Sequence, residues 1–227
     1  MIHHIPNVLT KEQVQYFRTE MAKIEWIDGK KTTGGLSAHV KNNQQLPEEH
    51  PLSLHLGDII LAELAKHAQF TSAALPLHIL PPYFNRYEHG ETFGFHVDNA
   101  IRWNNDAKQR MRTDLSCTVF LSEPEEYEGG ELVVEDTYGY HEIKLPAGDL
   151  ILYPSTSVHE VTPVTAGCRV ASFFWLQSMI RDDANRHMLF NLDQSIQNLR
   201  IELGDNHPEV VKLTSLYHNL LRKWAEL

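Results

Sequence analysis

The chain has 227 residues, of which 42% are hydrophobic and 22% charged, and its formal net charge is −10 with a pI near 5.7. This length suits one well-packed core with accessory helices, and the composition excludes disordered and fibrous proteins. The acidic balance, with no dense Lys/Arg run, argues against a nucleic-acid partner, and the lack of a long apolar stretch argues against a membrane protein.

Residues 1–75 are expected to form a mixed region of helices and strands that packs on the core. Thr10-Lys11-Glu12-Gln13 has the pattern of a capping box, and apolar residues follow it at helical spacing. These two features predict a helix that ends at about Met21. A second helical stripe predicts a helix from about Leu52 to Lys66.

Residues 76–178 have a different pattern, in which short β-rich runs alternate with turn residues. The strands that this pattern predicts cover residues 79–87, 114–121, 131–135, 141–145, 149–153, 158–163 and 169–176. Thr165-Ala166-Gly167 is expected to be the turn between the last two of them. Many short strands at regular spacing favour a sandwich or barrel, and a jelly roll (a double-stranded β-helix) buries this pattern while leaving a pocket.

Residues 179–227 are expected to be helical again, which makes the whole chain α+β. Two apolar stripes at helical spacing are separated by Gly204-Asp205-Asn206-His207-Pro208, and Pro208 suits a first helical turn. The tail is therefore predicted to be an αα-hairpin. Its stripes either pack on the β core or form, in part, a face between two copies of the chain in a homo-oligomer.

Two histidines and an aspartate form a candidate metal site. His96 and Asp98 are two residues apart, so an extended backbone directs both side chains to the same side. His159, on a separate predicted strand, is the best candidate for a third ligand. Two imidazoles and one carboxylate on one face of an ion leave the opposite positions open, as in non-haem Fe(II) oxygenases.

Arg169 follows ten residues after His159 and precedes an apolar run, Val170-Ala171-Ser172-Phe173-Phe174-Trp175. A guanidinium in such a strand is costly to bury unless an anion pairs with it. A bound carboxylate would suit its planar fork. The alternatives are a salt bridge to a core Asp or Glu, and a solvent-facing arginine at a strand edge.

These residues resemble the prolyl 4-hydroxylase-type Fe(II)/2-oxoglutarate dioxygenases. The matching positions are Tyr87, Gly90, Phe93, His96 and Asp98, then Gly129-Gly130-Glu131, Gly148-Asp149, His159 and Arg169. Runs such as Arg112-Thr113-Asp114-Leu115-Ser116 and Tyr153-Pro154-Ser155-Thr156-Ser157 resemble more closely the bacterial PKHD-type hydroxylases, and the helical tail extends this resemblance to nearly the full length. Arg169 stands where collagen-type prolyl hydroxylases have lysine.

The resemblance implies a cofactor set and a reaction. Fe(II) would be bound by His96, Asp98 and His159, and the distal carboxylate of 2-oxoglutarate by Arg169 and Tyr87. Tyr87 could instead be a core aromatic residue whose hydroxyl is satisfied. With O2, such an enzyme hydroxylates a small-molecule or peptidyl substrate and releases succinate and CO2, often with L-ascorbate as the reductant of iron. The sequence leaves the identity of that substrate open.

Three further residues are candidates for the pocket or its lid. Asn85 shares a strand face with Tyr87, and Asn99 and Arg102 lie in the polar stretch Asn99–Arg112 that follows the ligand pair. That stretch is either a lid over the substrate or a solvated loop.

Other classes of protein remain possible at this stage. A cupin-like metalloenzyme would use the same jelly roll without 2-oxoglutarate, but it would normally have a His-x-His pair. A zinc hydrolase could use two His and one Asp, which would leave Arg169 unexplained. A non-catalytic metal-binding module would more often have lost a ligand.

Neither Cys117 nor Cys168 has a partner pattern for a disulfide or a metal site, and no signal-peptide pattern opens the chain, so we expect a cytoplasmic protein.

Overall fold

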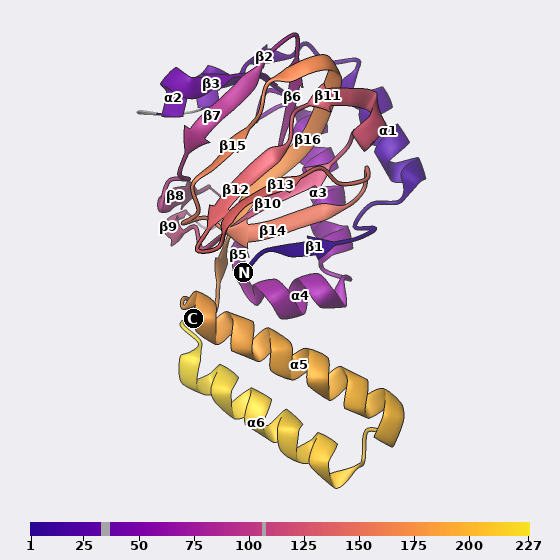
Figure 1. The fold of residues 1–227 in the computed structure, drawn as a ribbon, viewed down its shortest axis with the longest axis vertical. Coiled ribbons are helices and arrows are strands. Elements are labelled where there is room, and N and C mark those ends of the chain that lie inside the picture. Colours follow the sequence, from indigo (N-terminus) through magenta and orange to yellow (C-terminus); the bar gives the residue numbers. More distant parts are fainter. Residues whose placement is uncertain (33–36, 106–107) are drawn as a thin grey trace.

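The computed structural model describes residues 1–32, 37–105 and 108–227. Two antiparallel β-sheets face each other and form the core of the molecule (Figure 1). The larger sheet has the order β1-β14-β10-β16-β6-β4-β2, and β11 and β5 pair with β16 beside this path. Its strands are β1 (His3–Ile5), β2 (Ile27–Asp28), β4 (Gln44–Gln45), β5 (Pro76–Ile79), β6 (Tyr83–Glu88), β10 (Leu115–Phe120), β11 (Tyr127–Gly129), β14 (Leu150–Pro154) and β16 (Val164–Ser178).

The smaller sheet has the order β13-β12-β15-β7-β3, and β8 and β9 form a separate two-stranded hairpin. The strands concerned are β3 (Lys41–Asn42), β7 (Thr92–His96), β8 (Ile101–Asn104), β9 (Gln109–Arg112), β12 (Leu132–Asp136), β13 (Gly139–Ile143) and β15 (His159–Val161). Two facing antiparallel sheets are the arrangement that a jelly-roll core needs. Together with the helices they confirm the α+β class.

The helices lie outside the sheets. They are α1 (Lys11–Met21), α2 (Ser37–Val40), α3 (Pro51–Leu64), α4 (Ala68–Ala74), α5 (Asp183–Leu203) and α6 (Pro208–Trp224), with short 3-10 turns at Gly29–Thr32 and Pro124–Glu126. The capping box at the start of α1 is present: Thr10 Oγ1 accepts from the Gln13 amide at 3.2 Å, and Gln13 Oε1 accepts from the Thr10 amide at 2.8 Å. Among the described residues, no helix is long and apolar enough to span a membrane.

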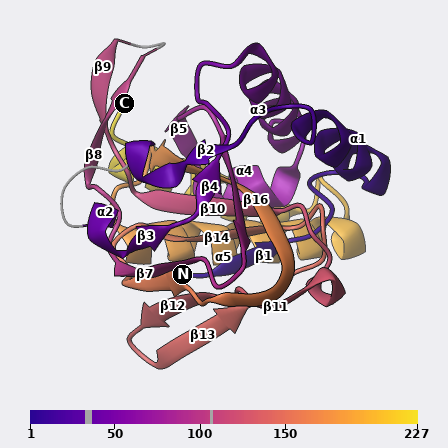
Figure 2. The same ribbon diagram turned by 90° about the horizontal axis from the view of Figure 1, so that it is seen from above.

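Side-chain alternation along the strands separates two hydrophobic cores. Seen from above, the larger sheet lies between α1 and α3 on one side and the smaller sheet on the other (Figure 2). The core on the helix side includes Phe17, Ile60, Phe84, Leu115, Val170 and Phe174. The core between the sheets includes Tyr87, Phe120, Leu132, Ile151, Val161 and Val164. Odd-numbered residues of the central part of β16 therefore face the second sheet, which is where the pocket lies.

Two strand predictions differ from the structure. The strand expected over residues 79–87 is split into β5 and β6, because Pro81 and Pro82 have no amide hydrogen to donate to the ladder. The turn expected at Thr165-Ala166-Gly167 lies within β16, which pairs there with β11. Gly167 has a φ of +73°, and a Cβ on it would lie 2.0 Å from the Glu126 carbonyl oxygen, so glycine permits this close pairing.

The N-terminal region supplies strands to both sheets. β1 pairs with β14, β4 pairs with β6, and β3 pairs with β7. Residues early in the chain therefore line the same cavity as residues from the central strands.

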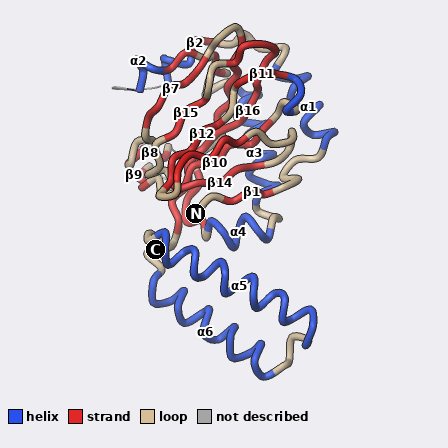
Figure 3. Tube along the Cα trace, viewed as in Figure 1, coloured by secondary structure: helices blue, strands red, loops and turns tan. Residues whose placement is uncertain are grey.

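The C-terminal hairpin of α5 and α6 extends from one end of the β core (Figures 1 and 3). Pro208 is at the first helical turn of α6, as the sequence predicts. The hairpin is attached through β1 and α4 rather than across a sheet face: His3 stacks edge-on against Phe190 with ring centroids 4.4 Å apart, and Ser72 Oγ donates to Asp193 at 2.7 Å. A face between two copies of the chain stays a prediction.

Candidate active site

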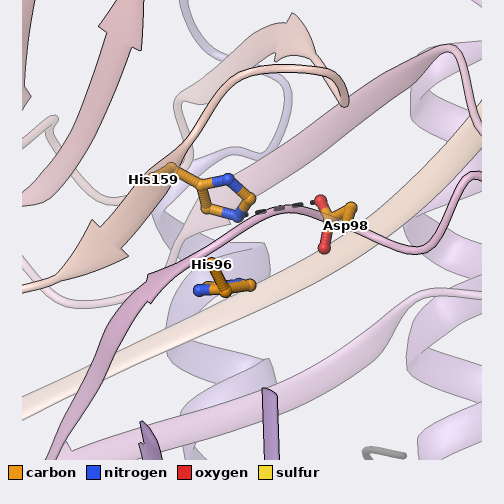
Figure 4. Close-up of side chains that lie close together, drawn as sticks. All are labelled: His96, Asp98 and His159. Atoms are coloured by element: carbon orange, nitrogen blue, oxygen red, sulfur yellow. Dashed lines mark ion pairs between the residues drawn. The ribbon is translucent and has the colours of Figure 1, made fainter. Parts of the chain in front are cut away.

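Strand pairing brings the three candidate metal ligands together. β15 pairs with β7 so that His159 lies opposite His96, and Asp98 follows two residues after His96. One ligand atom from each residue lies within 4.8 Å of the others. Figure 4 shows the three side chains converging on one space, with His159 Nε2 at 3.7 Å from Asp98 Oδ2.

Backbone carbonyls orient both imidazoles. His96 Nδ1 lies 2.8 Å from the Gly94 carbonyl oxygen, and His159 Nδ1 lies 3.0 Å from the Ser157 carbonyl oxygen. Since a carbonyl can only accept, each Nδ1 carries the hydrogen and each Nε2 keeps a lone pair for a metal. Burial, aided by the nearby His159, lowers the pKa of His96 to about 4, so this ring is neutral at neutral pH.

Two serines support the carboxylate of Asp98. Ser116 Oγ donates to Asp98 Oδ2 at 2.6 Å, and Ser116 Oγ lies 2.7 Å from Ser155 Oγ. Both serines are buried, so this contact is shielded from water. Hydrogen bonds of this kind hold a ligating carboxylate in one orientation. The sequence reasoning missed both residues as site residues, although they lie in runs that carry the family resemblance.

Arg169 is the most informative charged residue in the pocket. It is the sixth residue of β16 rather than its first, and only 1% of its surface is exposed. Its guanidinium lies over the rings of Tyr87 and Phe120, at 5.4 Å and 5.3 Å from their centroids. Its Nε has no hydrogen-bond partner among the described residues, and none of their carboxylates forms an ion pair with it. Arg169 is therefore not an exposed edge arginine, and it forms no core salt bridge within the described part of the chain.

Gly130 of the Gly-Gly-Glu run makes room for this arginine. A Cβ on Gly130 would lie 3.1 Å from Arg169 Cδ and 2.8 Å from Val164 Cγ2, and its φ of +68° favours glycine. The motif glycine thus has a steric reason that the sequence alone does not reveal.

Tyr87 lies directly opposite Arg169 in the ladder between β6 and β16. Burial raises the pKa of Tyr87 to about 12, so its hydroxyl remains a hydrogen-bond donor at neutral pH. The hydroxyl accepts from Asn85 Nδ2 at 3.4 Å. Asn85 Oδ1 is buried and has no hydrogen-bond partner within the part of the chain that the structure describes. Tyr87 and Asn85 both line the same cavity as the three candidate ligands.

The stretch Asn99–Arg112 is a β-hairpin, and the two residues at its tip, 106 and 107, lie outside the described part of the chain. Asn99 and Arg102 both line the cavity. The guanidinium carbon of Arg102 lies 3.5 Å from the ring centroid of Trp175. The stretch thus contributes two residues to the cavity lining, and its movement as a lid stays a prediction.

Comparison with known proteins assigns the chain to a family. The model of the 2OG-Fe(II) oxygenase superfamily matches residues 82–177, and the model of the PKHD-type hydroxylase C-terminal domain matches residues 183–226. A PKHD-type hydroxylase of Acinetobacter baumannii strain AYE is 74% identical over 227 residues, which is 100% of both chains. One from Stenotrophomonas maltophilia strain R551-3 is 57% identical over the same share. The chain belongs to the PKHD-type hydroxylases.

Solved structures share the fold at low identity. A Pseudomonas putida prolyl-4-hydroxylase is 19% identical with a TM-score of 0.53, and the match covers 78% of this chain and 92% of that one. A Trichoplax adhaerens prolyl hydroxylase, solved with a hypoxia inducible factor peptide fragment, is 14% identical with a TM-score of 0.58, over 83% and 86%. These likenesses show the fold alone.

Family membership makes this protein an Fe(II)- and 2-oxoglutarate-dependent dioxygenase whose substrate is unidentified. This outcome favours the first interpretation of the sequence over the cupin-like enzyme and the non-catalytic module. The site fits both groups that the family uses. Two imidazole nitrogen donors and one carboxylate suit Fe(II), and a buried arginine that has no carboxylate partner among the described residues suits a dicarboxylic cosubstrate.

Proposed function

We propose that His96, Asp98 and His159 hold Fe(II), that Arg169 and Tyr87 bind the distal carboxylate of 2-oxoglutarate, and that the enzyme hydroxylates a small-molecule or peptidyl substrate. The observation that carries this proposal is the buried guanidinium of Arg169, which has no carboxylate partner among the described residues and shares a cavity with the three ligands. A buried cation without a counter-ion is costly, and a bound carboxylate removes that cost.

When bound, iron and 2-oxoglutarate supply the oxidation of a substrate C–H bond by O2, with release of succinate and CO2. The protein's own residues contribute geometry and electrostatics. Ser116 holds the Asp98 carboxylate through a hydrogen bond to Oδ2. The Gly94 and Ser157 carbonyls keep the hydrogen on Nδ1 of each imidazole. Tyr87 stays protonated and can donate to a carboxylate.

Three finer points belong to the same proposal. L-ascorbate acts as the reductant that keeps iron active, as is common among relatives of this enzyme. The β8–β9 hairpin closes over bound substrate, which is supported by Asn99 and Arg102 lining the cavity. The enzyme works in the cytoplasm, which is supported by its two free cysteines, because secreted proteins more often oxidise theirs.

The direct test is an anaerobic Fe(II) titration of metal-stripped protein, with and without 2-oxoglutarate, followed through the visible charge-transfer band of the iron–keto-acid chelate. Wild type is compared with His96→Ala and with Arg169→Met. Lys144→Met serves as a matched control, because Lys144 donates to backbone carbonyls near the sheet edge and does not line the cavity.

We expect a band that requires both Fe(II) and 2-oxoglutarate, disappears in His96→Ala, needs far more 2-oxoglutarate in Arg169→Met, and is unchanged in Lys144→Met. Tight stoichiometric metal binding without any such band would refute the assignment of the cosubstrate. An unchanged band in His96→Ala would refute the ligand set.

A further inference from the structure

The two helices of the tail, α5 and α6, form a layer with two different sides. One side is a polar groove, and its lining includes Asp193, Gln197, Arg200, Val211 and His218. Asp193 also accepts a hydrogen bond from Ser72 of α4 at 2.7 Å. The groove is therefore on the side by which the tail is attached to the rest of the molecule.

The opposite side of the layer is apolar, and we call it the leucine face. Its residues are Met188, Leu192, Leu199, Leu213, Leu216 and Leu220. At about 3.6 residues per turn, they point roughly 100–160° away from Asp193 on α5 and from His218 on α6. None of the six is fully buried, and Met188 and Leu216 are 49% and 47% exposed. An apolar surface of this size on two neighbouring helices is a candidate for contact with another molecule.

The apolar pattern on each helix is symmetric about a central residue. On α5, Leu192 and Leu199 lie on either side of Ser195. On α6, Leu213 and Leu220 lie on either side of Leu216 in the same way. Each stripe therefore reads nearly the same in both directions along its helix, which a self-complementary interface requires.

The two centres lie at the same level of the hairpin. Ser195 is eight residues before Leu203, the last residue of α5, and Leu216 is eight residues after Pro208, the first residue of α6. At about 1.5 Å per residue, both centres are about 12 Å from the turn. A single two-fold axis that lies on the leucine face and crosses both helices can therefore pass over both centres.

A second copy placed about this axis covers the leucine face. Each helix then lies antiparallel on its own equivalent, with Leu192 against Leu199 of the second copy and Leu213 against Leu220 of the second copy. Two hairpins stacked in this way make a four-helix bundle, the arrangement in which such apolar stripes are normally buried.

The size of the face is sufficient for a dimer. The shorter helix, α6, has 17 residues. A two-helix layer of that length measures about 26 Å by 18 Å, so each copy would bury on the order of 500 Å². The total of about 1,000 Å² reaches the lower limit of specific interfaces.

The charges at the ends of α6 favour the antiparallel orientation. Glu209 and Lys223 are both exposed, and each is seven residues from Leu216, in opposite directions. Antiparallel pairing places Glu209 of each copy beside Lys223 of the other. A pairing with both turns at the same end would instead place Glu209 beside Glu202 of the second copy. Glu209 also pairs with Lys212 of its own helix at 3.5 Å, but such an exposed pair contributes little.

The same charges argue against a lipid surface as the occupant. Helices that lie on a membrane carry Lys and Arg around their apolar face. Here Glu202 and Glu209 are exposed near one end of the face, and the whole chain has a net charge of −10. Anionic lipid would repel such a surface.

We propose that the leucine face is the interface of a homodimer, in which two tails pair antiparallel as a four-helix bundle. The two β cores then lie at opposite ends of the bundle, and each keeps its own cavity. This inference does not depend on the assignment of iron or 2-oxoglutarate, because no residue of the leucine face lines the cavity.

Sedimentation velocity of the full-length protein over a wide range of concentration tests the proposal. Wild type is compared with Leu216→Glu, which puts four-helix packing against a charge at the two-fold axis. Val211→Glu is the matched control, because Val211 is 56% exposed on the same helix but lines the polar groove. Circular dichroism checks that the variants are folded.

We expect wild type and Val211→Glu to be dimers, and Leu216→Glu to dissociate with a Kd raised by roughly 100-fold or more. A wild type that is monomeric at every concentration would overturn the proposal. So would a dimer that Leu216→Glu leaves intact, or one that Val211→Glu dissociates equally. A monomer that binds anionic vesicles through Leu216 would assign the face to lipid instead.

Charge reversal tests the orientation at positions that do not endanger the fold. Glu209→Lys and Lys223→Glu should each weaken their own homodimer by roughly fivefold at low salt, because like charges then meet twice. An equal mixture of the two variants should form heterodimers of at least wild-type affinity, since opposite charges meet again at both ends. Homodimers of both variants that persist in the mixture, without heterodimers, would refute the antiparallel interface.

Discussion

Two regions of this molecule bury an arginine almost completely, and they treat it differently. Arg169 in the β core and Arg186 in the helical tail are each 1% exposed. Arg186 donates to the Ile180 carbonyl at 2.7 Å and to Asp183 Oδ1 at 2.6 Å, so the protein supplies its counter-ion. Arg169 forms no salt bridge with the described residues, although Nε is without a hydrogen-bond partner in both arginines.

The difference teaches how to tell a structural cation from a functional one. Burial alone is equal in the two cases, so it carries no information about role. A partnered cation stabilises the fold that surrounds it, whereas an unpartnered one is tolerated because a ligand completes it. Five predictions test this distinction, beginning with the largest effect.

His159→Ala should abolish activity. It removes one of three ligands that lie within 4.8 Å of one another, and two remaining ligands bind Fe(II) too weakly to position it. Succinate release with any substrate should fall below detection, while far-ultraviolet circular dichroism stays that of the wild type. Residual turnover at a wild-type level would mean that the metal site lies elsewhere.

Arg169→Met should raise the apparent KM for 2-oxoglutarate by roughly 100-fold, because a buried charge pair is lost. The free energy of unfolding of the ligand-free protein should not fall, since the removed guanidinium has no carboxylate partner to lose. Arg169→Lys should restore part of the affinity. A KM that stays at the wild-type value would refute the assigned role.

Arg186→Met should lower the stability of the fold and leave 2-oxoglutarate binding unchanged. The free energy of unfolding should fall by about 2 kcal/mol, because the bonds to Ile180 and Asp183 are lost in a buried setting. Chemical denaturation measures this change. The KM for 2-oxoglutarate should stay constant, and a rise comparable to that of Arg169→Met would remove the contrast between the two regions.

Ser116→Ala tests a partnered group inside the pocket. Ser116 holds Asp98 by a 2.6 Å hydrogen bond, as Asp183 holds Arg186 in the tail. Fe(II) affinity should fall by roughly tenfold, and 2-oxoglutarate affinity measured at saturating iron should change little. Ser116→Thr, which retains a hydroxyl, should recover iron affinity; if both variants bind iron normally, the serine does not position the carboxylate.

Lys41→Met should stabilise the fold at neutral pH, on the order of 1 kcal/mol, because burial and the neighbouring Arg102 lower the pKa of Lys41 to about 8. Below pH 8 the amine is charged in both the native and the unfolded state, so the native state carries the full free-energy cost of burying that charge. As pH rises from 8 towards the ordinary 10.5, the native state deprotonates first and the cost disappears. Glu48, Asp28 and Asp98 oppose the shift.

Denaturation of Lys41→Met and wild type at pH 7 and above pH 10 measures this difference. The gain in stability should shrink at the higher pH. A variant that is less stable than wild type at both pH values would mean that the contacts of Lys41 stabilise the fold by more than its burial costs.

Local sequence signals predicted several elements correctly. The capping box starts α1 where the pattern places it, and the break before Pro208 divides the tail into two helices. Such signals work because caps and helix periodicity depend on neighbours a few residues away. The three candidate metal ligands could be proposed for a similar reason, since His96 and Asp98 lie on one short extended run.

Non-local pairing explains what the sequence could not predict. The prediction of a turn at Thr165-Ala166-Gly167 was wrong because β11, from another part of the chain, pairs there and extends β16. Lys41 carries no motif, and its place in the cavity follows from the pairing of Lys41 with Phe93 between β3 and β7. Ser116 was overlooked as a support for Asp98 because its position in the sheet, opposite Trp175, depends on the pairing of β10 with β16, which the sequence does not reveal.

By itself, the sequence determined the α+β class, the family resemblance and the residues able to bind iron and a dicarboxylate, because these are carried by residue types at short, regular spacing. Only the tertiary structure decided that Arg169 is buried with no salt bridge to the described residues, and that Lys41, from the N-terminal region, lines the same cavity. Burial and charge balance depend on which distant strands pack together, and spacing along the chain does not specify that packing.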